Sequence, residues 1–170
     1  MEQNRFKRLW QHWQNPRWRV EQYFPTKELE RLSRAIGDSE RLHSGQVRFV
    51  VESRYDSADV LAGLHPHTRA LQWFGELGIW DTERNSGVLV YVSFADHVVE
   101  IVADRGIHAR VGNAAWQRVC AEMAAAFKQQ QYIGGLEQGL RAVTALLAEH
   151  FPKENDAPHH DELDNDIVLA

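Results

Sequence analysis

The longest apolar pattern in the chain lies between residues 86 and 107, and it predicts two strands joined by a tight connection. Residues 88–92 are all apolar, which is typical of a strand buried on both faces. A polar interruption at 95–97 precedes a second apolar run at 98–102, and Asp-Arg-Gly at 104–106 ends it. Such a hairpin needs helices on both sides of its sheet.

The flanking sequence supplies those helices and one further strand. Alternation over residues 46–52 predicts a strand with Val47, Phe49 and Val51 on one face. Helical spacing predicts a first helix with Thr26 as its N-cap, which carries Glu40 and His43 on one side of its last turn and ends at the left-handed cap Gly45. Further helices are predicted from about residue 59 to 77, after an N-cap at Asn113, and from about 133 to 150.

This order of elements predicts an α/β fold, a three-layer α/β/α sandwich with a small mixed sheet containing an antiparallel hairpin. The helical crossover makes the first two strands parallel, and the tight connection makes the third antiparallel to the second. We expect a basic, tryptophan-rich segment at residues 1–24, the α/β/α domain at 25–152, and an acidic tail at 153–170. The tail is expected to be disordered except for its apolar end at 167–169.

Composition and charge narrow the possible functions. The chain has 170 residues, 44% hydrophobic and 25% charged, which is ordinary for a globular domain. A net charge of −5 gives no support to nucleic-acid binding. The single cysteine, Cys120, fits a reducing compartment, and no stretch has the length of a membrane span or the pattern of a signal peptide. We therefore expect a cytoplasmic protein, with membrane association left open.

The first 24 residues combine basic and aromatic side chains. Phe6, Trp10 and Trp13 fall on one face of a predicted helix. One interpretation is peripheral membrane contact, with arginines facing acidic lipid and tryptophans at the headgroup level. The alternative, which we favour from the sequence, is that this aromatic face packs on the domain or on a second copy.

Three polar segments meet at one edge of the predicted sheet. Parallel strands share their starting edge and the antiparallel strand finishes there, so residues 40–45, 81–87 and 104–106 converge. We call these three segments the rim. Its carboxylates Glu40, Asp81 and Asp104 are candidate ligands for a divalent cation such as Ca²⁺ or Mg²⁺.

The rim also offers groups for chemistry beside such a cation. His43 is a candidate acid or base, and Arg84 and Arg105 are candidates for holding a phosphate. The remaining rim residues are Asn85, Gly45 and Gly106. The alternative is that these residues have only structural roles. Asp81 would form hydrogen bonds within a turn, Glu40 would form a surface ion pair, and His43 would lie at the C-terminal end of a helix, where it interacts with the helix dipole. No P-loop, dinucleotide-binding glycine motif, zinc-protease motif, Cys-x-x-Cys or nucleophile elbow is present.

The central motif resembles a known family. Residues 77–92 (LGIWDTERNSGVLVYV) and 99–107 (VEIVADRGI) resemble the TPM domain family, most of all its small bacterial branch without signal peptide or transmembrane helix. The segment 40–49 (ERLHSGQVRF) and the stop at 150–152 support the resemblance, which covers about residues 25–152.

The resemblance implies an α/β/α sandwich with a mixed sheet. For activity it implies two expectations: acid phosphatase activity, associated with a plant thylakoid-lumen relative that takes part in photosystem repair, and divalent-metal binding, seen in some bacterial relatives. The chain departs from the membrane-anchored branch at Gln46, where an acidic residue is common, and at 104–106, where a Gly-Tyr-Gly turn is common.

Two functional hypotheses follow. The first, which we favour, is a non-enzymatic interaction or assembly module with an unidentified protein partner or a membrane contact through residues 1–24, and with an optional cation at the rim. The second is a metal-dependent phosphatase-like hydrolase that uses Glu40, His43, Asp81 and Asp104.

Overall fold

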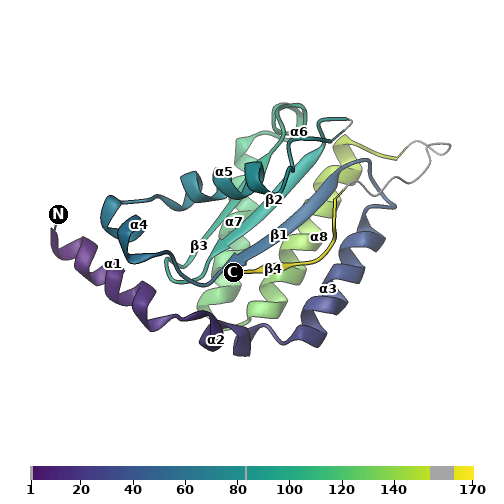
Figure 1. Ribbon diagram of the computed structural model, residues 1–170. Helices are drawn as coiled ribbons and strands as arrows, with labels where there is room; N and C mark the ends of the chain where they lie inside the picture. Colours follow the sequence, from purple (N-terminus) through teal and green to yellow (C-terminus); the bar gives the residue numbers. More distant parts are fainter. Residues whose placement is uncertain (1, 83, 154–162) are drawn as a thin grey trace.

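The computed structural model describes residues 2–82, 84–153 and 163–170, and it forms helical layers around one central sheet (Figure 1). The helices are α1 (Glu2–Gln14), α2 (Arg17–Val20), the 3-10 helix η1 (Glu21–Tyr23), α3 (Thr26–Ser39), α4 (Ser57–Ala62), α5 (Pro66–Glu76), α6 (Arg105–Val111), α7 (Asn113–Lys128) and α8 (Tyr132–His150). The strands are β1 (Gln46–Glu52), β2 (Gly87–Ser93), β3 (Val98–Ala103) and β4 (Val168–Leu169).

The sheet has the strand order β3-β2-β1-β4. β1 and β2 are parallel, with Gln46 beside Gly87, and β2 and β3 form the predicted antiparallel hairpin, with Val88 beside Ala103. β4, at the end of the chain, adds a short parallel strand to the other edge of β1. The predicted mixed sheet is therefore confirmed, and the starts of β1 and β2 lie at the same end as the finish of β3.

Two hydrophobic clusters fill the spaces on either side of the sheet. The alternation of β1 is confirmed, because Val47, Phe49 and Val51 belong to one cluster and Val50 to the other. The first cluster takes its other side chains mainly from α3, α7 and α8, and the second from α4 and α5. This is the expected three-layer α/β/α sandwich, visible in Figure 1 as α5 on one side of the sheet and α3, α7 and α8 on the other.

Glycines allow close approach at two places in these layers. A Cβ on Gly139 of α8 would lie 2.3 Å from the sulfur of Met123 on α7, so a larger residue there would require the buried Met123 side chain to move. A Cβ on Gly87 would lie 2.1 Å from the backbone oxygen of Ile79, so the start of β2 requires glycine where the rim joins the sheet.

Several predicted helix boundaries are wrong. α3 ends at Ser39, so Glu40 is its C-cap and His43 lies in the following turn rather than in the last helical turn. Gly45 does not adopt a left-handed conformation; its Cβ position is 3.0 Å from Leu147, which makes it a close-packing glycine. The N-caps of α3 and α7 are Pro25 and Gly112, each one residue before the predicted N-caps Thr26 and Asn113.

The structure also adds a helix that the sequence pattern did not predict. α6 begins directly after Asp104, its N-cap, and contains Arg105 and Gly106. The polar Asp-Arg-Gly sequence ends β3 as predicted, but it also starts this short helix. Residues 154–162, the centre of the acidic tail, lie outside the described residues, and the apolar end of the tail forms β4. None of the described helices combines the length and the apolar character needed to cross a bilayer.

Candidate functional site

The three rim segments do meet at one end of the sheet. The N–H of Gln46 donates to the oxygen of Ser86 at 2.9 Å, and the N–H of Asp104 donates to the oxygen of Gly87 at 2.9 Å. The start of β2 therefore holds both neighbouring segments through backbone hydrogen bonds.

Glu40 and His43 point into the protein. Both are 1% exposed. A carboxylate oxygen of Glu40 accepts the N–H of Val47 at 2.9 Å, which fixes the turn before β1. The Nδ1 atom of His43 lies 3.0 Å from the oxygen of Gly45, and because a carbonyl only accepts, Nδ1 carries the proton. Burial lowers the pKa of His43 to about 4, so the ring is neutral near pH 7.

The remaining predicted side chains of the rim differ from this buried pair. Asp81, Arg84 and Arg105 are exposed. Asp104 is half-buried, and one of its carboxylate oxygens is buried with no hydrogen-bond partner among the described residues. Asn85, with a φ of 50°, is exposed in the turn before β2. Gly106 lies next to this turn, because a Cβ on it would be 3.6 Å from the oxygen of Asn85.

The rim thus brings backbone segments together without grouping their carboxylates. In the described parts of the chain, no three His, Cys, Asp or Glu side chains are close enough together to hold a metal ion. The carboxylate of Glu40 is buried and bonded to Val47, whereas Asp81 is exposed to solvent, so these two predicted ligands are in different environments. Chemistry at the rim would therefore depend on Asp104 more than on the other predicted ligands.

The opposite end of the sheet carries a connected polar network that the sequence analysis did not predict. Glu52, at the end of β1, is 5% exposed, and its carboxylate accepts from Arg69 at 2.8–3.0 Å, from the indole N–H of Trp73 at 3.0 Å and from the hydroxyl of Tyr91 at 2.6 Å. Tyr91 also lies 3.0 Å from the hydroxyl of Tyr55. Burial raises the pKa of Tyr55 to about 12, and burial likewise raises that of Tyr91, so both phenols stay protonated as donors.

The network continues to α1 through Asp96, which lies in the turn between β2 and β3. Arg8 of α1 contacts both carboxylate oxygens of Asp96, at 2.7 and 2.8 Å. His12, one helical turn later and 2% exposed, places Nε2 at 3.1 Å from Asp96, while its Nδ1 accepts the N–H of Tyr55 at 2.9 Å. Burial alone would raise the pKa of Asp96, but the hydrogen bonds from Arg8 and His12 outweigh it and hold that pKa well below its usual range.

This attachment leaves the aromatic side of α1 facing solvent. Phe6, Trp10 and Trp13 are 66%, 56% and 64% exposed, and Trp18 of α2 is 65% exposed. The rings of Trp10 and Trp13 lie 5.1 Å apart. This face therefore does not pack on the domain, which was one half of the interpretation favoured from the sequence; its other half, packing on a second copy, stays a prediction. α1 packs against the domain instead through Leu9, Arg8 and His12 on its other side. We call Phe6, Trp10, Trp13 and Trp18 the aromatic face.

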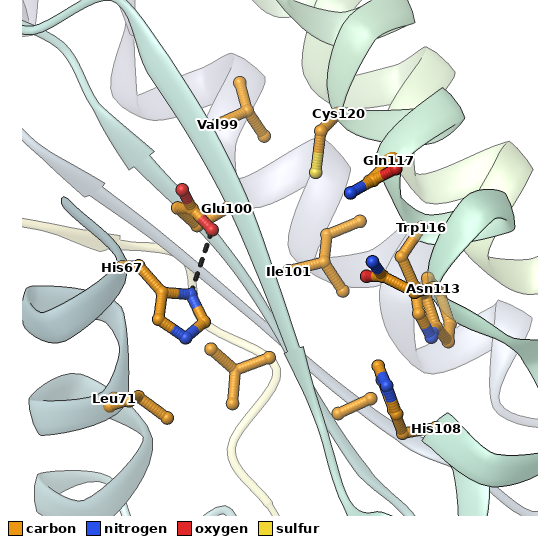
Figure 2. A pocket seen from close by; sticks show the side chains of 12 residues that line it. His67, Leu71, Val99, Glu100, Ile101, His108, Asn113, Trp116, Gln117 and Cys120 are labelled. Atoms are coloured by element: carbon orange, nitrogen blue, oxygen red, sulfur yellow. Dashed lines mark hydrogen bonds and ion pairs between the residues drawn. The ribbon is translucent and has the colours of Figure 1, made fainter.

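A groove of about 540 Å³ lies on a third part of the molecule, along the outer side of β3 (Figure 2). α5 forms one wall with His67 and Leu71, and α7 forms the other; its wall residues are Asn113, Trp116, Gln117 and Cys120. Figure 2 shows His67 directed at Glu100 of β3, and their side chains lie 3.1 Å apart. Burial raises the pKa of the Cys120 thiol to about 12, which makes it a poor nucleophile.

The sequence did contain one signal of the missed network. Arg8 and His12 stand four residues apart, so they share a helix face, and that face is distinct from the aromatic one. Their partner Asp96 lies 88 and 84 residues away in the chain, in a turn where aspartate is common for local reasons. Sequence spacing alone could therefore not show that Arg8 and His12 contact Asp96.

Comparison with known proteins gives one family match. The family model described as the TPM domain matches residues 20–146. α1 lies before the matched region, whereas Glu52, Tyr91 and Asp96 lie within it. The comparison with curated proteins found no match.

Three solved structures with a similar fold are bacterial proteins. The BA42 protein of the psychrophilic bacterium Bizionia argentinensis is 30% identical, with a TM-score of 0.72 over 84% of this chain and 92% of that one. The N-terminal domain of a P. gingivalis protein is 18% identical, with a TM-score of 0.58 over 78% and 80% of the two chains. The N-terminal domain of a Corynebacterium glutamicum protein is 14% identical, with a TM-score of 0.54 over 79% and 83%. The latter two show similarity of fold alone.

Proposed function

The chain belongs to the TPM domain family, and from this premise we propose that it is a non-enzymatic interaction module that docks on an anionic membrane surface through α1 and α2. The observation that carries the proposal is the aromatic face, four large side chains more than half exposed on helices that precede or border the matched domain. Exposed aromatic clusters of this kind mark interaction surfaces.

The charges around the aromatic face support a lipid partner. Arg5, Lys7, Arg17 and Arg19 are all exposed on α1 and α2. Trp and Tyr rings favour the headgroup level of a bilayer, and basic side chains beside them are attracted to acidic lipid. This combination favours an anionic membrane over an uncharged surface.

A hollow beside the aromatic face offers space for a lipid headgroup. It measures about 550 Å³, and its lining includes Trp13, Trp18, Arg19 and Arg54. A phosphate placed there would meet two guanidinium groups, which suit phosphate geometry. The Arg8–Asp96 contact on the other side of α1 fixes the helix to the domain, so docking of α1 would dock the whole domain.

Vesicle sedimentation tests this proposal. We expect the full chain to sediment with vesicles of phosphatidylglycerol and phosphatidylcholine, to bind phosphatidylcholine vesicles weakly, and to release as salt rises. The double variant Trp10→Ala/Trp13→Ala should bind at least tenfold more weakly. Trp80→Ala is the matched control, because Trp80 is 57% exposed at the rim end of β2. Equal binding by all three proteins, or a dimer held by the aromatic face without vesicle binding, contradicts the proposal.

A second candidate function is a cation-dependent phosphomonoester hydrolase at the rim. The observation that favours it is the buried oxygen of Asp104 that lacks a partner among the described residues, since an unpaired buried carboxylate oxygen is costly unless a cation meets it. In this proposal Asp104 holds the ion, and Arg84 or Arg105 holds the phosphate. Asp81, Glu40 and His43, the other predicted groups, do not form a metal-binding group with Asp104 in the described residues, so they would have to move to reach the ion. The buried state of Glu40 and His43 makes this the weaker proposal.

A thermal shift measurement tests the cation first. An ion bound only by the folded protein raises its melting temperature, and we expect a rise of about 3 °C or more with saturating Ca²⁺ or Mg²⁺. Asp104→Asn keeps the shape of the side chain and should abolish the rise. Melting temperatures that no divalent cation raises contradict the cation site and, with it, the hydrolase.

A further inference from the structure

β3 is an edge strand in the described part of the chain. It pairs with β2 on one side, and no described strand pairs with its other side. The hydrogen bond from the N–H of Asp104 to the oxygen of Gly87 sets the alternation of this antiparallel ladder. Every second residue bonds to β2, so the backbone groups of Val99, Ile101 and Ala103 point away from the sheet. These outward groups are a template for a further strand.

The groove described above runs along this template. Its floor is residues 99–103 of β3, and its walls are α5 and α7, so the outward backbone groups are recessed between two helices rather than exposed on a flat edge. The wall residues Asn113 and Gln117 are four positions apart on α7, and both are exposed. Figure 2 shows both on the β3 side of α7, near Ile101. Their amide groups can donate to and accept from a neighbouring backbone.

The opposite edge of the same sheet shows what such an edge binds. Val168 and Leu169 pair with Val50 and Val51 of β1, and Ala170 extends the pairing with a bond from its N–H to the oxygen of Val51 at 3.0 Å. An extended, uncharged segment from far along the chain therefore already fills one edge. The other edge has the same backbone chemistry and no such segment among the described residues.

We propose that the groove between α5 and α7 binds an extended, uncharged peptide segment of a partner protein as a fifth strand on β3. The contacts would be backbone hydrogen bonds to Val99, Ile101 and Ala103, the mode known as β-augmentation. Glu100, the one carboxylate of the groove, is already paired with His67, so the lining favours an uncharged segment over a basic one. About five residues would span the strand, since each extends it by roughly 3.3 Å.

Ile101 connects the present structure to the proposed complex. Its backbone acts on the thiol of Cys120 on the α7 wall and lowers the pKa of that thiol, against the larger opposite effect of burial. Sulfur is a weak acceptor, so a peptide carbonyl would give this backbone group a stronger hydrogen-bond partner. Peptide binding and the environment of Cys120 are therefore linked.

Titration of the isotope-labelled full chain with a defined peptide tests this inference by NMR. The probe is a blocked, uncharged octapeptide in which threonine and valine alternate. We expect the amide signals of residues 99–103 to shift, and the hydrogen exchange of the Ile101 and Ala103 amides to slow at least tenfold on saturation. Two variants should weaken binding at least tenfold: Ile101→Pro, which removes an outward N–H, and Gln117→Trp, which fills the groove without touching the strand.

Glu122→Trp is the matched control, because Glu122 is exposed on α7 outside the groove, and it should bind the peptide normally. Three results would overturn the inference. These are no binding at millimolar peptide, shifts confined to the β1–β4 edge, or protection of Ile101 that follows protein concentration without peptide, which would place a second copy at the edge. Gln117→Trp keeps the test decisive if Ile101→Pro fails to fold.

Discussion

At the rim, Glu40 and His43 each bond to the backbone of the segment beside them, whereas at the opposite end of the sheet Glu52 and Asp96 bond to side chains from distant helices. The sequence predicted a site at the rim because polar residues from three segments converge there. The other end is where polar side chains actually contact one another. Convergence of segments therefore does not by itself make a chemical site; the direction of each side chain decides it.

The difference between the two ends of the sheet also bears on the proposed function. At the rim, the side chains of Asp81 and Arg105 are exposed, while the buried carboxylate of Glu40 fixes a turn. At the other end, the Asp96 contacts attach α1 and leave the aromatic face outward. The buried polar groups of that end thus hold the surface that we propose to be functional.

The largest expected effect of substitution lies at Glu52. Glu52→Gln removes the charge that faces Arg69 and alters the hydrogen bonds of Tyr91 and Trp73. We expect the free energy of unfolding to fall by about 3 kcal/mol, because the remaining partners stay buried without their anion. Urea denaturation measures this.

Glu100→Gln is the control for that experiment. Glu100 pairs with the exposed His67, and we expect a change below about 0.5 kcal/mol. If the two variants lose the same free energy of unfolding, the buried network at the end of β1 contributes no more to stability than an exposed ion pair does.

Asp96→Asn is expected to cost somewhat less and to act on one helix. It removes the charge that Arg8 and His12 contact, and we expect a loss of about 2 kcal/mol. The amides of α1 should exchange hydrogen at least tenfold faster, while those of α7 and α8 change little. Uniform acceleration across all helices would show that Asp96 supports the whole fold rather than α1.

The two ends should also respond differently to pH. The pKa of His43 falls from 6.5 in the unfolded chain to about 4 in the fold because of burial, so the unfolded state binds a proton first as pH falls. The stability from His43 is present above pH 6.5 and is lost between pH 6.5 and about 4, by about 3 kcal/mol. His43→Asn should flatten stability over this window. The lowered pKa of Asp96 keeps the other end ionised there, so Asp96→Asn should leave the slope unchanged.

The smallest expected effect on stability is at the aromatic face. Trp10→Ala/Trp13→Ala removes side chains that are 56% and 64% exposed, so the free energy of unfolding should change by less than about 0.5 kcal/mol. Thermal or urea denaturation checks this. A large loss would mean that the face has a structural role, and it would weaken the case for a docking surface.

Local pattern was enough to predict the sheet and its layers. The alternation of Val47, Phe49 and Val51 and the unbroken apolar run of β2 follow directly from which faces are buried. α6 was missed because seven residues bounded by Asp104 and Gly112 carry too short a helical pattern. The N-caps Pro25 and Gly112 lie one residue before the predicted positions, and neither makes a side-chain capping hydrogen bond that a sequence motif could have indicated.

Side-chain direction was the part that sequence could not supply. The rim was placed correctly, because strand direction determines where segments converge. That Glu40 and His43 point inward depends on the turn after Ser39, which the helix prediction had extended too far. The Asp96 network depends on contacts across more than 80 residues, and no local periodicity reports such contacts.

The most direct test of the central claim, that the network presents the aromatic face to a membrane, is fluorescence quenching by brominated phosphatidylglycerol vesicles. Brominated acyl chains quench only tryptophans that enter the bilayer. We predict strong quenching of the full chain, its loss in the triple variant Trp10→Phe/Trp13→Phe/Trp18→Phe, and its retention in Trp80→Phe. Quenching that persists in the triple variant, or that disappears in Trp80→Phe, would contradict the account.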